Sequence, residues 1–206
     1  NDNFNLYMTS LVQMIHVSVE EDKLSVFWAL LSYGFILDVQ SGGSLLDMLI
    51  CKMGINEIYL NEKVQTIFLN GKVVDDFSTE IVKDESIIAL SAAMPGLVGA
   101  VFRKGGILSS MRSEHLSHLE CKPIKSQKGQ VTLKLFNLIA ADLGADFFKK
   151  GICVKGKYFI RYIKSKQSLL KSVCRQLIID GKHYEIGDFL SCCRPEADII
   201  LTVTPA

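Results

Sequence analysis

Residues that could bind a metal ion gather in one short segment of the chain. His115, His118 and Cys121 offer two imidazoles and a thiol within seven residues, and these are ligand types that zinc and other first-row metals prefer. On a regular helix, steps of three residues turn by about 300°, so the first and third side chains diverge by roughly 120°. The segment therefore predicts a metal site only if its backbone is irregular, and a polar surface helix is the alternative reading.

A second group of residues could hold an anion. Arg103, Lys104 and Arg112 flank the Gly/Ser-rich stretch 105–110, where exposed backbone N–H groups beside cations could bind a phosphate or a carboxylate. The glycines match neither the dinucleotide fingerprint nor the P-loop pattern. The stretch therefore predicts either an anion site or a solvated connector, and we find no catalytic motif elsewhere in the sequence.

Six cysteines are present, without a CxxC pair or regular spacing. A chain of 206 residues with 49% hydrophobic residues does not need disulfides to fold. We therefore expect six reduced thiols, as in a cytoplasmic protein, and no cofactor.

Composition limits the classes of partner. Lysine and arginine total 23 against 22 acidic residues, so the protein as a whole has no field that attracts nucleic acid or anionic lipid, and only a local patch could do so. The longest uncharged apolar run, 87–102, is interrupted by proline and glycine and is shorter than the roughly 20 residues that span a bilayer. We therefore expect neither a nucleic-acid nor a membrane partner, and no signal-peptide pattern is visible.

Local patterns in the first half predict short elements that would position such sites. Ser44 is a good N-cap for a helix over 44–53, with apolar residues on one face. Residues 64–69 and 72–74 read as strands around the hairpin turn Asn70-Gly71, and 86–90 reads as another strand. In the N-terminal segment, the apolar stretches 14–19 and 24–31 on either side of the acidic turn 20–22 are compatible with a hairpin.

The same landmarks recur in the second half at a constant offset of 110 residues. Asp180-Gly181-Lys182 repeats Asn70-Gly71-Lys72, and Pro205 repeats Pro95. Residues 158–173 precede the second turn as the helix at 44–53 precedes the first. Because a fixed period indicates repeated structural units, we predict an α+β fold of two tandem modules, in which Gly71 superposes on Gly181.

The order of these elements resembles the β-grasp (ubiquitin-like) fold, nearest to the sulfur-carrier branch of ThiS/MoaD-like proteins. The resemblance covers roughly residues 24–96 and is carried by the helix start 43–49, the turn 68–72 and the last strand 84–90. It implies, in each module, a mixed sheet packed against a short helix. Sulfur carriers use a free C-terminal Gly-Gly, whereas Gly105-Gly106 is internal here, so the resemblance implies the fold and not the thiocarboxylate chemistry.

These observations predict an N-terminal extension or first strand over 1–19, module 1 over 20–100, an ordered connector over 101–127 and module 2 over 128–206. We expect a non-catalytic interaction protein that binds a protein partner or self-associates, because open sheets can pair edge to edge. One alternative is a binder of a small anionic ligand, or an enzyme, with its site at the connector. The other alternative is a metal-binding protein.

Overall fold

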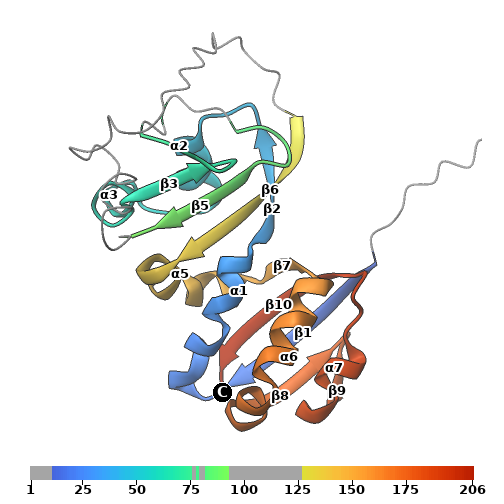
Figure 1. The fold of residues 1–206 in the computed structure, drawn as a ribbon. Helices are drawn as coiled ribbons and strands as arrows, with labels where there is room; N and C mark the ends of the chain where they lie inside the picture. Colours follow the sequence, from blue (N-terminus) through green and yellow to red (C-terminus); the bar gives the residue numbers. More distant parts are fainter. Residues whose placement is uncertain (1–10, 76–77, 79–81, 93–126) are drawn as a thin grey trace, which may run out of the picture. The chain divides into compact units, whose positions relative to one another are not determined.

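A computed structural model describes residues 11–75, 78, 82–92 and 127–206. The chain divides into two compact units: unit 1 comprises residues 1–27 and 145–206, and unit 2 comprises residues 28–144. Each unit combines strands with helices (Figure 1), so the predicted mixture of α and β structure is confirmed. These ranges differ from the predicted modules 20–100 and 128–206.

The described residues of unit 1 form five strands. Their order across the sheet is β7-β10-β1-β8-β9, in which β1 and β10 run parallel and the other neighbours antiparallel. Its strands are β1 (Val12–Val19), β7 (Ile152–Lys155), β8 (Cys174–Ile179), β9 (Lys182–Tyr184) and β10 (Asp198–Pro205). Its helices are η1 (Glu21–Phe27), α6 (Gly156–Val173), η4 (Ile186–Asp188) and α7 (Phe189–Cys192).

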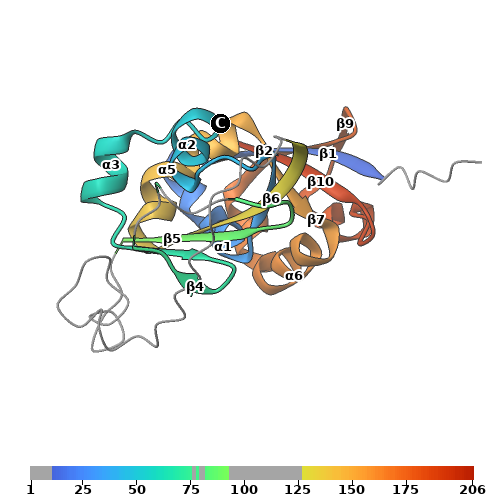
Figure 2. The same cartoon turned by 90° about the horizontal axis from the view of Figure 1, so that it is seen from above.

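The long helix α6 covers one face of this sheet, and Figure 2 shows it on one side of β7, β10 and β1. Alternate strand residues such as Ile15, Val17 and Leu201 are buried on that face, as the two-residue period of a strand requires. Aromatic side chains join the helix to the rest of unit 1, because the Phe27 ring lies 5.7 Å from that of Tyr162. The Tyr162 hydroxyl donates to the Val26 carbonyl at 2.7 Å, which satisfies the one polar atom that this ring buries.

The described residues of unit 2 also form five strands, in the order β4-β3-β5-β6-β2. β5 and β6 run parallel, and the other neighbours are antiparallel. The strands are β2 (Phe35–Ser41), β3 (Thr66–Leu69), β4 (Lys72–Val73), β5 (Ile87–Ser91) and β6 (Gln127–Phe136). The helices are α1 (Trp28–Tyr33), α2 (Leu45–Asp47), η2 (Met48–Lys52), α3 (Glu57–Glu62) and α5 (Asn137–Lys150), the last of which continues into unit 1.

The helix predicted over 44–53 is present as α2 followed by one π-helical turn, η2. Ser44 is its N-cap, since the Ser44 hydroxyl accepts from the Asp47 N–H at 3.0 Å. Leu45, Leu49 and Met53 are buried, as expected, whereas Ile50 is only half-buried. The wider π turn rotates the following side chains away from the 3.6-residue period, which explains the difference at Ile50.

Both predicted hairpin turns are confirmed. Asn70 and Gly71 have φ values of 52° and 80°, and Asp180 and Gly181 have values of 49° and 79°. Two consecutive positive φ angles are the requirement of the type I′ turn, which only Gly, Asn and Asp adopt readily. Each turn joins a pair of strands, β3 to β4 in unit 2 and β8 to β9 in unit 1.

The interpretation of residues 14–31 as a hairpin is wrong. Its first arm is β1, but residues 21–33 form η1 and α1. Phe27, Leu30 and Leu31 are buried, and their spacing is that of a helical face. β1 pairs instead with β8 and β10, which are distant in sequence, so a local pattern does not reveal them.

Each unit combines strands from both halves of the sequence. β1 pairs with β8 and β10 of the second half, while β6 pairs with β2 and β5 of the first half. Buried residues form corresponding rows across the strands of each unit. The row in unit 2 is Phe35, Leu133, Ile88 and Leu69, and the row in unit 1 is Ile152, Leu201, Ile15 and Ile179. Thus β1 takes in unit 1 the place that β5 has in unit 2, and β10 takes the place of β6.

Candidate functional site

The sequence-predicted site residues lie outside the part of the chain that the structure describes. This holds for the metal cluster His115, His118 and Cys121. It also holds for the anion-binding residues Arg103, Lys104 and Arg112, and for all but the last residue of the connector 101–127. Both sites therefore stay predictions. Among the described residues, no group of three or more His, Cys, Asp and Glu side chains could hold a metal ion.

Two histidines in unit 1 have identifiable neighbours. His16 Nδ1 lies 2.9 Å from the Thr202 hydroxyl, which connects β1 to β10. His183 Nδ1 lies 3.4 Å from the Gln176 amide on the neighbouring strand. Neither imidazole is within hydrogen-bond distance of a described serine, cysteine or carboxylate, so neither forms a nucleophile–base pair of the kind that covalent catalysis uses.

Five of the cysteines lie in the described residues, and no disulfide joins any two of them. Burial raises the pKa of Cys174 to about 12, and burial together with the neighbouring Cys192 raises the pKa of Cys193 to about 12. Because the thiolate is the reactive form, both thiols are protonated and inert at neutral pH.

The helix α6 carries a cluster of exposed cations on its outward face. Its start is fixed by Gly156, whose N–H donates to the Ala197 carbonyl at 2.8 Å. A Cβ atom at Gly156 would lie 2.2 Å from the Arg194 carbonyl oxygen, so only glycine allows the helix to begin this close to the loop before β10. The inward face of α6 is anchored by the buried residues Phe159, Tyr162, Ile163, Leu170 and Val173.

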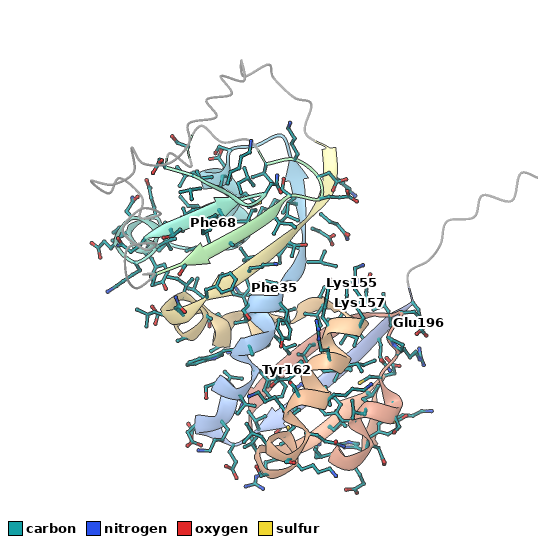
Figure 3. All side chains as sticks on the ribbon, viewed as in Figure 1. Phe35, Phe68, Lys155, Lys157, Tyr162 and Glu196 are labelled. Carbon is teal, nitrogen blue, oxygen red and sulfur yellow. The ribbon has the colours of Figure 1, made fainter. Side chains whose placement is uncertain are left out.

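Opposite this buried face lies a row of exposed cations, which we call the α6 cation stripe: Lys157, Arg161, Lys164 and Lys171. Their spacing of four, three and seven residues keeps them on one side of a helix with 3.6 residues per turn. The stripe extends about 21 Å along the helix axis at a rise of 1.5 Å per residue. Figure 3 labels Lys157, at its N-terminal end, together with the buried Tyr162.

The stripe is not neutralised by acidic neighbours. α6 contains no Asp or Glu, and none of the four stripe cations forms a salt bridge with a carboxylate in the described part of the chain. Lys155, which directly precedes α6, provides a contrast, because its Nζ pairs with Asp198 Oδ1 at 2.8 Å. The stripe therefore presents four uncompensated positive charges to solvent.

An aromatic ring borders the stripe. Tyr158 is 40% exposed, and the Lys157 ammonium lies 4.9 Å from the centre of its ring, within the range of a cation–π contact. A shallow hollow of about 370 Å3 runs along this part of the helix, lined by Lys157, Tyr158, Ile160, Arg161 and Lys164. The surface can thus contact an anion and a flat ring at the same time.

Other hollows in the described residues have mixed charge. The one in unit 2, of about 660 Å3, is lined by lysines as well as carboxylates, Lys52 and Asp84 among them. Asp84 Oδ1 already accepts N–H groups from Glu85 and Gln130 at 3.0 and 2.7 Å. The hollow beside β9, also about 660 Å3, includes Arg175, which is paired with Glu20. Asp84 and Arg175 are therefore already paired with neighbours within the protein.

The sequence contains a signal for the α6 cation stripe, which is not a catalytic or metal-binding motif. From Lys149 to Arg175 the chain has nine lysines and arginines and no acidic residue. The acidic residues are concentrated elsewhere, so the nearly neutral total charge gives no sign of this basic segment. Only the helical register shows that four of the cations share one exposed face.

No protein-family model, no curated protein and no solved structure matches the chain. The geometry of the described residues therefore carries the functional argument. No helix in the described residues combines the length and apolar character that a membrane span needs.

Proposed function

We propose that the protein is a non-catalytic binding protein whose α6 cation stripe binds an acidic macromolecule. The observation that carries this proposal is the row of exposed cations on α6, which no carboxylate among the described residues pairs. Unpaired charges of one sign attract a partner of opposite sign and steer its approach. The helix is held by a fully buried inner face, so the cations lie on a rigid element, as a binding surface requires.

The proposal includes a β-grasp-like character for both units and an origin by duplication. It is supported by the shared succession of strand, helix, strand, type I′ turn and strand in β2 to β4 and in β7 to β9. The corresponding buried rows support it as well. The proposal accounts for the different positions of β5 and β10 by an exchange of the central strands between the two units.

The proposal is tested by measuring binding of the full chain to two anionic probes, poly-L-glutamate and oligothymidylate. The stripe variant K157Q/R161Q/K164Q/K171Q removes the four charges. The matched control K52Q/K63Q/K72Q/K128Q removes four exposed lysines of unit 2. We expect wild type and control to bind at least one probe in a salt-dependent manner, and the stripe variant to lose that binding.

The proposal is overturned if wild type binds neither probe, or if the stripe variant binds as well as wild type. Circular dichroism of all three proteins checks that folding is retained, which is expected because substitutions at exposed sites usually change the unfolding free energy by less than about 0.5 kcal/mol. The predicted sites at residues 103–112 and 115–121 are tested separately, by anion titration and by metal analysis of the purified protein.

A further inference from the structure

We infer that the acidic macromolecule is a single-stranded nucleic acid, whose phosphates lie on the α6 cation stripe and one of whose bases stacks on Tyr158. This inference rests on the proposed function and names its ligand class. It departs from the expectation drawn from the total charge, because binding depends on the local concentration of cations and not on their sum.

The stripe matches an extended chain of phosphates. Lys157, Arg161 and Lys164 are separated along the helix axis by about 6 and 4.5 Å, and Lys171 lies about 10.5 Å further on. Lysine and arginine contacts to the backbone provide most of the affinity in sequence-independent binding. The row is straight and lies on a convex helix surface, which suits a flexible strand that can follow it.

Tyr158 is the feature that favours a nucleic acid over an acidic polypeptide. Its ring is exposed beside the stripe and borders the hollow that also contains Ile160. Surfaces that bind single strands combine a basic path with aromatic side chains, because every base has a π face that can stack. A glutamate-rich peptide has no group that would use the ring.

An anionic lipid surface is a poorer match. A helix that lies in a membrane interface needs a free apolar face, whereas the apolar face of α6 is buried against the sheet. The exposed side of α6 is cationic along its length, with Tyr158 and Leu169 as its exposed large apolar residues.

The experiment measures the affinity of the full chain for an oligothymidylate of about 12 nucleotides, within the usual site sizes of single-strand binders, between about 50 and 200 mM salt. Four phosphate contacts predict a slope of about −3 for log Kobs against log[salt], at about −0.7 per contact. R161Q should make the slope shallower by about 0.7. K63Q, at an exposed lysine of unit 2, should leave it unchanged.

Tyr158 is tested on the same probe. Y158A should weaken binding at least about fivefold without changing the salt slope, because no charge is removed. Y158F should bind as wild type, since the ring is retained. Unchanged affinity of Y158A would overturn the role of Tyr158 in stacking.

Two further probes separate the ligand classes. Binding of poly-L-glutamate without binding of the oligonucleotide overturns this inference and leaves the proposed function standing. Binding only to vesicles of phosphatidylserine and phosphatidylcholine overturns both the inference of a nucleic acid and the proposal that the ligand is an acidic macromolecule. Binding to none of the probes overturns the proposed function itself.

Discussion

Asp180 and Met14 hold the β8–β9 turn against the neighbouring strand β1 through two hydrogen bonds. The Met14 N–H donates to Asp180 Oδ1 at 2.9 Å, and the Asp180 N–H donates to the Met14 carbonyl at 2.8 Å. Asn70 and Ile87 make the same pair of bonds in unit 2, at 2.8 Å each. The turn residue therefore attaches its hairpin to the adjacent central strand in both units.

This correspondence predicts that Asp180→Asn retains stability and that Asp180→Ala lowers it. Alanine loses the bond to Met14 and must also adopt a positive φ, each at a cost of about 1 kcal/mol. Urea unfolding should show a loss of about 1–3 kcal/mol for the alanine variant. In unit 2, Asn70→Asp should likewise be tolerated. Equal stability of D180A and wild type would show that the side chain contributes nothing.

The buried face of the α2–η2 helix gives a second prediction. Leu49 is fully buried and Ile50 is half-buried. Leu49→Ala should lower the unfolding free energy by about 2–5 kcal/mol, because it removes buried methyl groups and leaves a cavity. Ile50→Ala is the neighbouring control and should cost clearly less. If the two variants lost equal stability, the assignment of the buried face would be wrong.

Gly156 is predicted to accept no side chain. Gly156→Ala places a methyl group 2.2 Å from the Arg194 carbonyl oxygen, so the start of α6 or the loop before β10 must shift. Such overpacking costs about 1–3 kcal/mol, measured by thermal or urea unfolding. Gly187→Ala is the matched control, because a Cβ there meets no atom within 4 Å. A G156A protein as stable as G187A would argue against this close approach.

The buried thiols make stability depend on pH. The folded state raises the pKa of Cys174 and Cys193 from 9.0 to about 12. Between these values the unfolded state loses thiol protons that the folded state keeps, so the unfolding free energy falls as pH rises. We expect a decline between pH 9 and 12 in urea unfolding.

Replacement of both residues by alanine removes these thiols and should flatten the decline, whatever its effect on stability at pH 7. Alkylation of the native protein should modify the exposed Cys51 before Cys174 or Cys193. After denaturation without a reductant, all six thiols should react, as the sequence predicts. Fewer than six would reveal a disulfide.

Structural features that depend on neighbouring residues could be predicted from the sequence. Ser44 as an N-cap, the turns at Asn70-Gly71 and Asp180-Gly181, and the apolar period of the helix starting at residue 44 all depend on neighbouring residues. The same holds for the run of cations from Lys149 to Arg175, which a charge count along the chain would have found. These features are encoded within a few residues, so a pattern is sufficient to predict them.

The tertiary structure decided which strands lie at the centre of each unit's set of strands. β1 and β5 are both short apolar strands with a row of buried side chains, so the sequence pattern alone does not show which of them pairs with which hairpin. Pairing of β1 with β8 and β10, and of β6 with β2 and β5, depends on hydrogen bonds between segments far apart in the chain. The tertiary structure also decided which cations near α6 face solvent. Folding pairs Lys155 with Asp198. It leaves the α6 cation stripe, Lys157, Arg161, Lys164 and Lys171, facing solvent, because the sheet buries the opposite side of the helix.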